Sequence, residues 1–381
     1  MLKKLFTSCL ISLSCLQAAD SQISKYSATI NEYSSDTRSD VKKIEPSSDY
    51  SISIGKAIDQ KTFAKICSDL KWITQLNTSY GNKNLESFAP LAKLTKLRYF
   101  EAINWTKSAE TPISLDAFES LTDLEELNFY ATRITNTAAL SKLTKLKKLS
   151  LYMSAVDDIS FLSNLLELEE LDLYGFEHTF KDYASLAKLV KLKKLNTYMN
   201  TQATNKNMTV FSNLTQLEEF SSSNNDHITH IDFLSKASEL TELNLKWCRK
   251  LKNINALKNC SKLKEVDLTD APINSIAVLE NKIHLKELDL EGTKVTDLSP
   301  LKSCKQLQIL NIAETAITDI SALENCPNLK SLNLNKTIIK DLTPLHKSKY
   351  LRRLSYSLNI PNEEIEILKK LLPECKFRIN N

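Results

Sequence analysis

The chain has 381 residues, with 50 Lys and Arg against 46 Asp and Glu, so its formal net charge is only +4. A balance so close to neutral argues against nucleic acid as a partner. The 4 glycines, Gly55, Gly81, Gly175 and Gly292, lie too far apart for a glycine-rich phosphate loop, which excludes the nucleotide-binding motifs.

The first residues have the pattern of a secretory signal peptide. Two lysines precede an apolar run over 5–16, and small residues follow at Ala18 and Ala19. A run of this length is too short to cross about 30 Å of hydrocarbon as a helix. We therefore expect residues 1–19 to be a signal peptide that is removed on export, leaving no integral membrane segment. A buried N-terminal helix is the alternative.

Two further segments precede the regular part of the chain. Residues 20–55 are rich in Ser, Asp, Lys and Tyr without a sustained period, which predicts a flexible polar spacer. Residues 56–70 regain a helical pattern with Asp59 as its N-cap, and Phe63 and Ile66 fall on one face. We expect this helix to cap the N-terminal end of the regular part.

From residue 71 the sequence repeats itself. Leu285, Leu307 and Leu329 stand 22 residues apart, and a period of this length with the pattern LxxLxL is typical of a leucine-rich-repeat solenoid. The expected fold is an α/β repeat over 71–358, with a curved parallel β-sheet on the concave side and short 3₁₀ turns on the convex side. Helical caps, the second at 359–381, close it. The strand motifs of about 13 repeats begin at Ile73, Leu97, Leu124, Leu146, Leu168, Leu192, Leu217, Leu240, Leu263, Leu285, Leu307, Leu329 and Leu351.

The 22-residue form LxxLxxLxLxxTxIxDLxPL, read over 285–345, resembles the bacterial repeats of the internalin family. This resemblance covers roughly residues 70–358. The tail over 360–379 is similar to the short helix and LPxCK ending that closes many bacterial leucine-rich-repeat proteins. The resemblance implies binding of a host or cell-surface protein through the concave face.

The seventh position of the strand motif LxxLxLxx carries tyrosines in four successive repeats. In a strand the side chains alternate, so the leucines point inward and the third, fifth and seventh positions point outward. An exposed aromatic column predicts anchors for a protein ligand. The alternative is that the rings only stabilise neighbouring strands by stacking. The predicted protein-binding residues are Tyr130, Tyr152, Met153, Tyr174, Tyr198, Met199 and Trp247.

Charged residues at the outward positions form two patterns. The third position alternates in sign through Glu126, Lys148, Glu170, Lys194 and Glu219, which predicts a lateral ladder of ion pairs. In later repeats the outward positions carry acidic residues without alternating lysines. Such a surface attracts a basic partner or a divalent cation; the alternative is a solvated face that keeps the protein soluble. The predicted acidic concave patch is Glu242, Glu265, Asp267, Asp270, Glu287, Asp289 and Glu291.

The sequence supplies no chemistry for catalysis or metal binding. Cys260, Cys304 and Cys326 occupy a core position of the repeat, and a bridge between Cys304 and Cys326 is an open alternative. His227 and His230 form HxxH without a third ligand, and CxxC, GxSxG and HExxH are absent. We expect no cofactor and no metal, and a protein that is not an enzyme.

Three functions remain. The first is a secreted or surface-exposed bacterial protein that binds a host or cell-surface protein as a monomer. The second is a periplasmic or secreted scaffold for an endogenous partner. A hydrolytic enzyme is the third, and it has no motif to support it.

Overall fold

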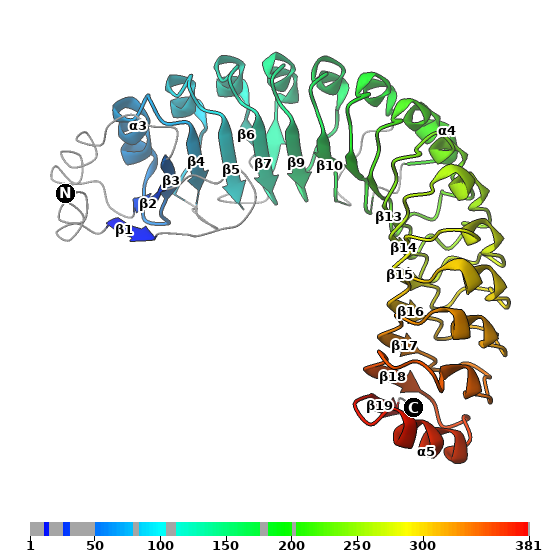
Figure 1. Ribbon diagram of the computed structural model, residues 1–381. Coiled ribbons are helices and arrows are strands. Elements are labelled where there is room, and N and C mark those ends of the chain that lie inside the picture. The colour runs from blue at the N-terminus through cyan, green and yellow to red at the C-terminus, as the bar shows by residue number, and fades with distance from the viewer. Residues whose placement is uncertain are drawn as a thin grey trace. The chain divides into compact units, whose positions relative to one another are not determined.

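The computed structural model describes residues 11–14, 26–30, 50–78, 84–103, 112–175, 182–199 and 203–379. The chain divides into two compact units, Met1–Lys191 and Leu192–Asn381, and each is described by itself. Most of the expected signal peptide, residues 1–10 and 15–19, lies outside the described ranges. In both units the strands succeed one another along one side and the helical turns lie on the other side (Figure 1).

The first unit is built on one sheet whose neighbouring strands are parallel, except that β1 pairs with β2 antiparallel. Its strands are β1 (Ile11–Ser14), β2 (Tyr26–Ile30), β3 (Tyr50–Ile54), β4 (Gln75–Thr78), β5 (Tyr99–Ile103), β7 (Glu126–Tyr130), β9 (Lys148–Tyr152) and β10 (Glu170–Asp172). Its helices are α3 (Gln60–Asp69) and the 3₁₀ helices η1 (Ala89–Lys93), η2 (Asp116–Ser120), η3 (Thr137–Lys142), η4 (Ser160–Asn164) and η5 (Ala184–Lys188). Strands β6 (Ile113–Ser114) and β8 (Ile134–Thr135) form a separate parallel pair.

The second unit repeats the same plan with an entirely parallel sheet. Its strands are β11 (Lys194–Asn196), β12 (Glu219–Ser221), β13 (Glu242–Asn244), β14 (Glu265–Asp267), β15 (Glu287–Asp289), β16 (Ile309–Asn311), β17 (Ser331–Asn333), β18 (Arg353–Tyr356) and β19 (Lys376–Ile379). Its helices are α4 (Asn205–Met208), η6 (Thr209–Asn213), η7 (Asp232–Leu234), η8 (Asn255–Asn259), η9 (Ala277–Leu279), η10 (Ser299–Ser303), η11 (Ser321–Asn325), η12 (Thr343–Leu345) and α5 (Asn362–Leu371).

The repeat of the sequence sets the register of both sheets. Leu288 on β15 lies opposite Leu310 on β16, which lies opposite Leu332 on β17, and each is 1% exposed. Apolar surface is thus buried against the next turn at every strand, which is the main stabilising term of such a repeat. The structure confirms the expected leucine-rich-repeat solenoid, with a parallel sheet and short 3₁₀ turns.

Threonines close the turn after several strands. The hydroxyls of Thr293, Thr315 and Thr337 donate to the carbonyls of Leu290, Ile312 and Leu334, at 2.7, 2.7 and 2.8 Å. All three threonines are buried. Because a buried carbonyl without a partner costs free energy, these side chains have a structural role.

The expectation of a flexible spacer over 20–55 is not met at β2 and β3. Strand β3 pairs with β4, and Ile52 and Ile54 are 1% and 0% exposed. Tyr26 lies opposite Tyr50, 24 residues later, which matches the spacing of the repeats. The solenoid pattern therefore begins before residue 71, and α3 lies between β3 and β4 instead of covering the end of the sheet. The remaining spacer residues, 20–25 and 31–49, lie outside the described ranges.

The expected C-terminal cap contains a helix and a further strand. Helix α5 buries Ile365 and Leu368, and Glu364 accepts a hydrogen bond of 2.9 Å from the backbone N–H of Leu342 in the preceding turn. Strand β19 pairs in parallel with β18, so the sheet continues into the expected cap. No helix within the described ranges is long and apolar enough to span a membrane.

One residue in most turns adopts the left-handed backbone region that side chains normally disfavour. After the strands this position is held by Ala131, Met153, Met199, Asn224, Trp247, Asp270, Gly292, Glu314 and Lys336, with φ between 48° and 68°. Only one of these is glycine, although glycine adopts this conformation without steric cost. The turn geometry therefore imposes strain at most repeats.

Replacing Ala131 by glycine should stabilise the protein, the reverse of the usual effect. Ala131 has φ 48°, and the left-handed conformation costs a non-glycine residue about 1–2 kcal/mol. The extra freedom of glycine in the unfolded chain costs only about 0.4–1 kcal/mol. We expect the free energy of unfolding in denaturant titration to rise by about 0.5–1 kcal/mol. The control is Ala139→Gly in η3, which should lower it; a loss at both positions would contradict the strain argument.

Candidate functional site

The outward positions of the strands form one continuous surface in each unit, which we call the sheet face. On β7 the side chains of Leu127 and Phe129 are buried. Those of Glu126, Asn128 and Tyr130, which alternate with them, are partly or fully exposed. The same alternation recurs on β9. The sheet face is therefore where the predicted binding residues should lie.

Three of the predicted tyrosines form a stack on the sheet face of the first unit. The ring centroids of Tyr130 and Tyr152 are 4.7 Å apart and their planes differ by 8°. Those of Tyr152 and Tyr174 are 4.1 Å apart and differ by 7°. Tyr130 is 42% exposed, and the other two are half-buried. We call these residues the tyrosine stack.

Stacking changes which part of each ring is available. The faces of Tyr152 are covered by its two neighbours, so this ring can offer a partner only its edge and its hydroxyl. Burial, then the hydrogen bond and the proximity of Tyr174, raises the pKa of Tyr152 to about 12. The hydroxyl is therefore neutral at physiological pH and keeps its proton for donation.

Other residues extend the stack on the sheet face of the first unit. Ile103 on β5 lies opposite Tyr130 and is half-buried. Met153 comes directly after Tyr152 with φ 52°, and its side chain is also half-buried. The stack is thus flanked by apolar side chains at positions where an aromatic pattern gives no signal.

The remaining predicted anchors belong to the second unit. Tyr198 and Met199 are half-buried, and the backbone N–H of Tyr198 donates to Asn196 Oδ1 at 3.0 Å. Trp247, with φ 61°, is half-buried as well. The Lys246 ammonium lies 4.6 Å from the centroid of its ring, within the range of a cation–π contact.

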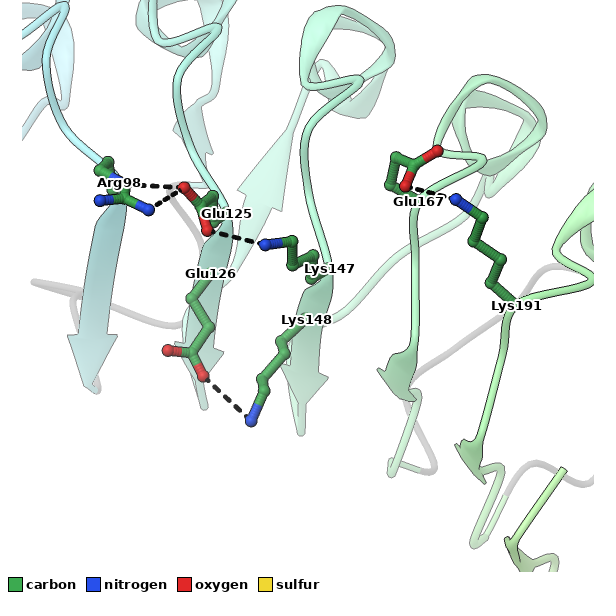
Figure 2. A network of polar contacts seen from close by, with 7 residues as sticks. All are labelled: Arg98, Glu125, Glu126, Lys147, Lys148, Glu167 and Lys191. Carbon is green, nitrogen blue, oxygen red and sulfur yellow. Dashed lines mark hydrogen bonds and ion pairs between the residues drawn. The ribbon is translucent and has the colours of Figure 1, made fainter. Parts of the chain in front are cut away.

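The predicted charge ladder is confirmed in each unit. Lys148 Nζ lies 3.6 Å from Glu126 Oε1 and 3.1 Å from Glu170 Oε1, and in the second unit Lys194 Nζ lies 2.6 Å from Glu219 Oε1. Figure 2 shows a second row beside the first, in which Glu125 pairs with both Arg98 and Lys147. Glu167 pairs with Lys191 in the same region (Figure 2).

These ion pairs join neighbouring turns of the first unit, but they are at least partly exposed to solvent, and such pairs contribute at most about 1 kcal/mol each. Their main effect is to neutralise the charge around the tyrosine stack. A partner would therefore contact the edges of the tyrosine rings, surrounded by charged residues that are already paired with one another.

The acidic residues of the second unit lie in two adjacent columns of its sheet face. Glu242, Glu265 and Glu287 occupy successive strands directly opposite one another, and Asp267 lies opposite Asp289. Burial, and then the like charge of Glu219 and Glu265, raises the pKa of Glu242. Burial and Glu265 likewise raise the pKa of Glu287. The direction of both shifts is that of carboxylates with too few positive neighbours.

The remaining acidic residues make specific contacts at the end of these strands. The Asn311 amide donates to Asp289 Oδ2 at 3.0 Å and to Glu291 Oε2 at 2.8 Å. The Asp270 carboxylate lies over Gly292, where an added Cβ would be 2.3 Å from Asp270 Oδ1. Glycine at 292 thus adopts its φ of 68° without the strain that side chains bear at this position in other turns, and it leaves room for the Asp270 carboxylate.

The cysteines within the described ranges are buried and form no disulfide. Cys67, Cys248, Cys260, Cys304, Cys326 and Cys375 are all free, so the alternative bridge between Cys304 and Cys326 is not formed. Burial raises the pKa of the Cys304 thiol to about 11. A buried, protonated thiol is a poor nucleophile and a poor metal ligand. Within the described ranges no group of three or more His, Cys, Asp or Glu could hold a metal ion.

Replacing Glu242 by glutamine should stabilise the protein at neutral pH. Like charges directly opposite on neighbouring strands cost roughly 0.2–1 kcal/mol, and the substitution removes them. Because the folded-state pKa of Glu242 is raised, the cost is present in full above that pKa and disappears as the pH falls towards the unfolded value. The gain in the free energy of unfolding should therefore shrink in acid.

The control for this prediction is Glu126→Gln, at the same repeat position but paired with Lys148. That substitution should leave the free energy of unfolding unchanged or lower it slightly. Equal effects of the two substitutions in denaturant titrations at pH 7 would show that like-charge repulsion does not act at Glu242.

The comparisons with known proteins agree with this architecture. A family model described as Leucine Rich repeats (2 copies) matches residues 283–325 and 305–347. An internalin of Listeria monocytogenes is similar in structure, with 25% sequence identity and a TM-score of 0.68, covering 77% of this chain and 82% of that one. A leucine-rich-repeat protein of Leptospira interrogans has 16% identity and a TM-score of 0.67, covering 91% and 93% of the two chains.

A more distant similarity is to a chain in the Toll–Spätzle complex of Drosophila, with 15% identity and a TM-score of 0.61, covering 93% of this chain and 55% of that one. No curated protein matches the sequence. The bacterial structures and the family model confirm the expected resemblance to internalin-like leucine-rich-repeat proteins. Proteins of this fold generally mediate protein–protein binding.

Proposed function

We propose that this chain is an exported bacterial protein that binds a host or cell-surface protein through the sheet face of its first unit. The observation that carries the proposal is the tyrosine stack, in which three partly exposed rings are held parallel at 4.7 and 4.1 Å. Large aromatic side chains that are already ordered lose little conformational entropy on binding, which makes them effective anchors.

The surroundings of the tyrosine stack support a protein ligand. The ladder of ion pairs leaves no strong field that would select a small ion or a polyanion. The three hydroxyls offer donors and acceptors beside the half-buried Met153, a combination of polar and apolar contact that is typical of protein interfaces.

The acidic columns of the second unit supply a second contact in this proposal. Glu265 and Glu287 are exposed and lie opposite each other without an ion pair among the described residues. Trp247 in the same unit adds an aromatic surface, and Tyr198 and Met199 add apolar area. A partner with a basic segment would be attracted there, and its association would slow as salt is added.

Export is the other part of the proposal. It rests on the sequence of residues 1–19, and cleavage after them removes β1 from the sheet. We propose that the mature protein is secreted or held at the cell surface, and that it acts without catalysis as a binding scaffold.

Cleavage of the signal can be checked by intact-mass measurement of the exported product. We expect the mass of a chain that begins after Ala18 or Ala19, because small residues at this point are what the peptidase accepts. A matched variant in which Leu10 and Leu13 are replaced by arginine should stay unprocessed, since it interrupts the apolar run. Recovery of an uncleaved chain from the wild type outside the cell would contradict the signal assignment.

The binding site can be tested with variants that remove either the tyrosine rings or only their hydroxyl groups. The protein ligand would first be captured with the wild-type chain from host membranes and, in parallel, from the producer's own envelope. Tyr152→Ala with Tyr174→Ala should then weaken that complex at least about tenfold, because the loss of such anchors typically costs about 2 kcal/mol or more. If the ligand is captured only from the producer's own envelope, the result favours the alternative function, a scaffold for an endogenous partner.

Two variants sharpen this experiment. The triple Tyr130→Phe, Tyr152→Phe and Tyr174→Phe retains stacked rings, so thermal unfolding should stay close to wild type while binding falls if the hydroxyls contact the partner. Tyr350→Ala, a residue of the second unit that is 56% exposed, is the control and should change neither property. Wild-type affinity in the Ala double variant would rule out the tyrosine stack as the binding site.

A further inference from the structure

A buried lysine stands in the helical layer of the second unit, on the side away from the sheet face. Lys282 lies just after η9 and is only 3% exposed. Its ammonium donates to the carbonyls of Leu257 and Lys258 in the preceding turn, at 2.8 and 2.9 Å. Among the described residues no carboxylate pairs with it, and burial lowers its pKa. A buried cation without a counter-ion is costly.

The hydrogen bonds of Lys282 do not explain why a lysine is there. At the equivalent position 22 and 44 residues later stand Cys304 and Cys326. Their thiols donate to the equivalent carbonyls, those of Leu279 and Leu301, at 3.9 and 3.6 Å. A small neutral donor therefore serves this contact in the next two turns, and the positive charge at Lys282 is an addition to it.

A half-open pocket adjoins Lys282, and we call it the cavity. Helix η9 has 3 residues, whereas η8 and η10 on either side have 5. Asn281 has φ 64°, although the equivalent Ser303 and Asn325 lie inside 3₁₀ helices. The cavity measures about 630 Å³, and its lining is Asn255, Lys258, Ser261, Ala277, Val278, Glu280, Asn281 and Lys282.

The chemistry of the cavity is that of a site for a small anion. An ammonium can donate three hydrogen bonds, and two of those of Lys282 are used. Lys258 is exposed at the rim and forms no ion pair among the described residues. Ser261, Asn255 and Asn281 can also donate. Glu280 is the one carboxylate of the lining.

We propose that this cavity binds the oxyanion of a small molecule, a phosphate or a carboxylate group, between the ammonium groups of Lys282 and Lys258. The bound anion supplies the counter-charge that Lys282 lacks in the protein. The cavity volume is within the range of about 300–1,000 Å³ that is usual for small-molecule sites, so the ligand can be larger than the anionic group itself. This site is separate from the tyrosine stack and does not depend on the proposed protein binding.

The test is a calorimetric titration of the purified full chain with inorganic phosphate and, separately, with succinate, at constant ionic strength set with chloride. We expect saturable binding of one or both; phosphate alone identifies a phosphate site, and succinate a carboxylate site. Lys282→Cys should weaken binding at least about tenfold, the effect of losing roughly 1.4 kcal/mol of interaction. Because cysteine is the residue of the next two turns, this variant should retain its thermal unfolding temperature.

Two further variants keep the test decisive if Lys282→Cys is unstable. Lys258→Gln removes the exposed cation of the same cavity and should also weaken binding. Lys302→Gln is its control, since Lys302 occupies the equivalent repeat position in η10 but is not part of the cavity lining. Absence of saturable binding by both anions, or equal binding by wild type and the Lys258→Gln variant, would overturn the proposal.

Discussion

The fold depends on the packing of each turn's leucines against those of the next turn in strict register. This register places Leu288, Leu310 and Leu332 in line, and by doing so it places every other residue opposite its counterpart one period away. Where successive turns carry the same residue, like therefore meets like. The side chain decides whether such a pairing is favourable. Tyrosine rings stack on each other, thiols and hydroxyls donate hydrogen bonds to carbonyls, and carboxylates repel one another.

The two units use this rule differently on their sheet faces. In the first, glutamate and lysine alternate along the third position of the strand motif. Lys148 neutralises the charge of Glu126 and Glu170 on the two neighbouring strands, so the tyrosine stack lies among balanced charges. In the second, Glu242, Glu265 and Glu287 face one another and their mutual repulsion remains. The same backbone thus presents one surface suited to close apolar contact and another suited to attraction of positive charge.

Much of this was accessible from the sequence, because a fixed period determines register without any knowledge of the rest of the chain. The 22-residue spacing located the strands and the ladder through Lys148. The repeat was not recognised at Tyr26–Ile30 and Tyr50–Ile54, because Ala28 and Ile52 stand at the register position where the next strand has Leu76. The spacing of 24 between these two strands was nevertheless present in the sequence.

The candidate site was predicted in its residues but not in its geometry. The tyrosines were identified by position, but the covering of each ring face by the next results from side-chain rotamers, which a sequence pattern does not specify. Ile103 was missed because it is not aromatic. Lys282 could have been found as a charged residue at a position held by cysteine in the turns on either side. The cavity beside it could not, because residue spacing does not reveal a surface pocket.

The buried thiols have a consequence for how the second unit comes apart. Cys260, Cys304 and Cys326 sit at one position in different turns, each shielded as long as its own turn is packed. A chain of stacked units can fray from an end, so the sulfur nearest the loosening end would meet an alkylating reagent first. The order in which these sulfurs are modified would therefore record the direction in which the coil unwinds.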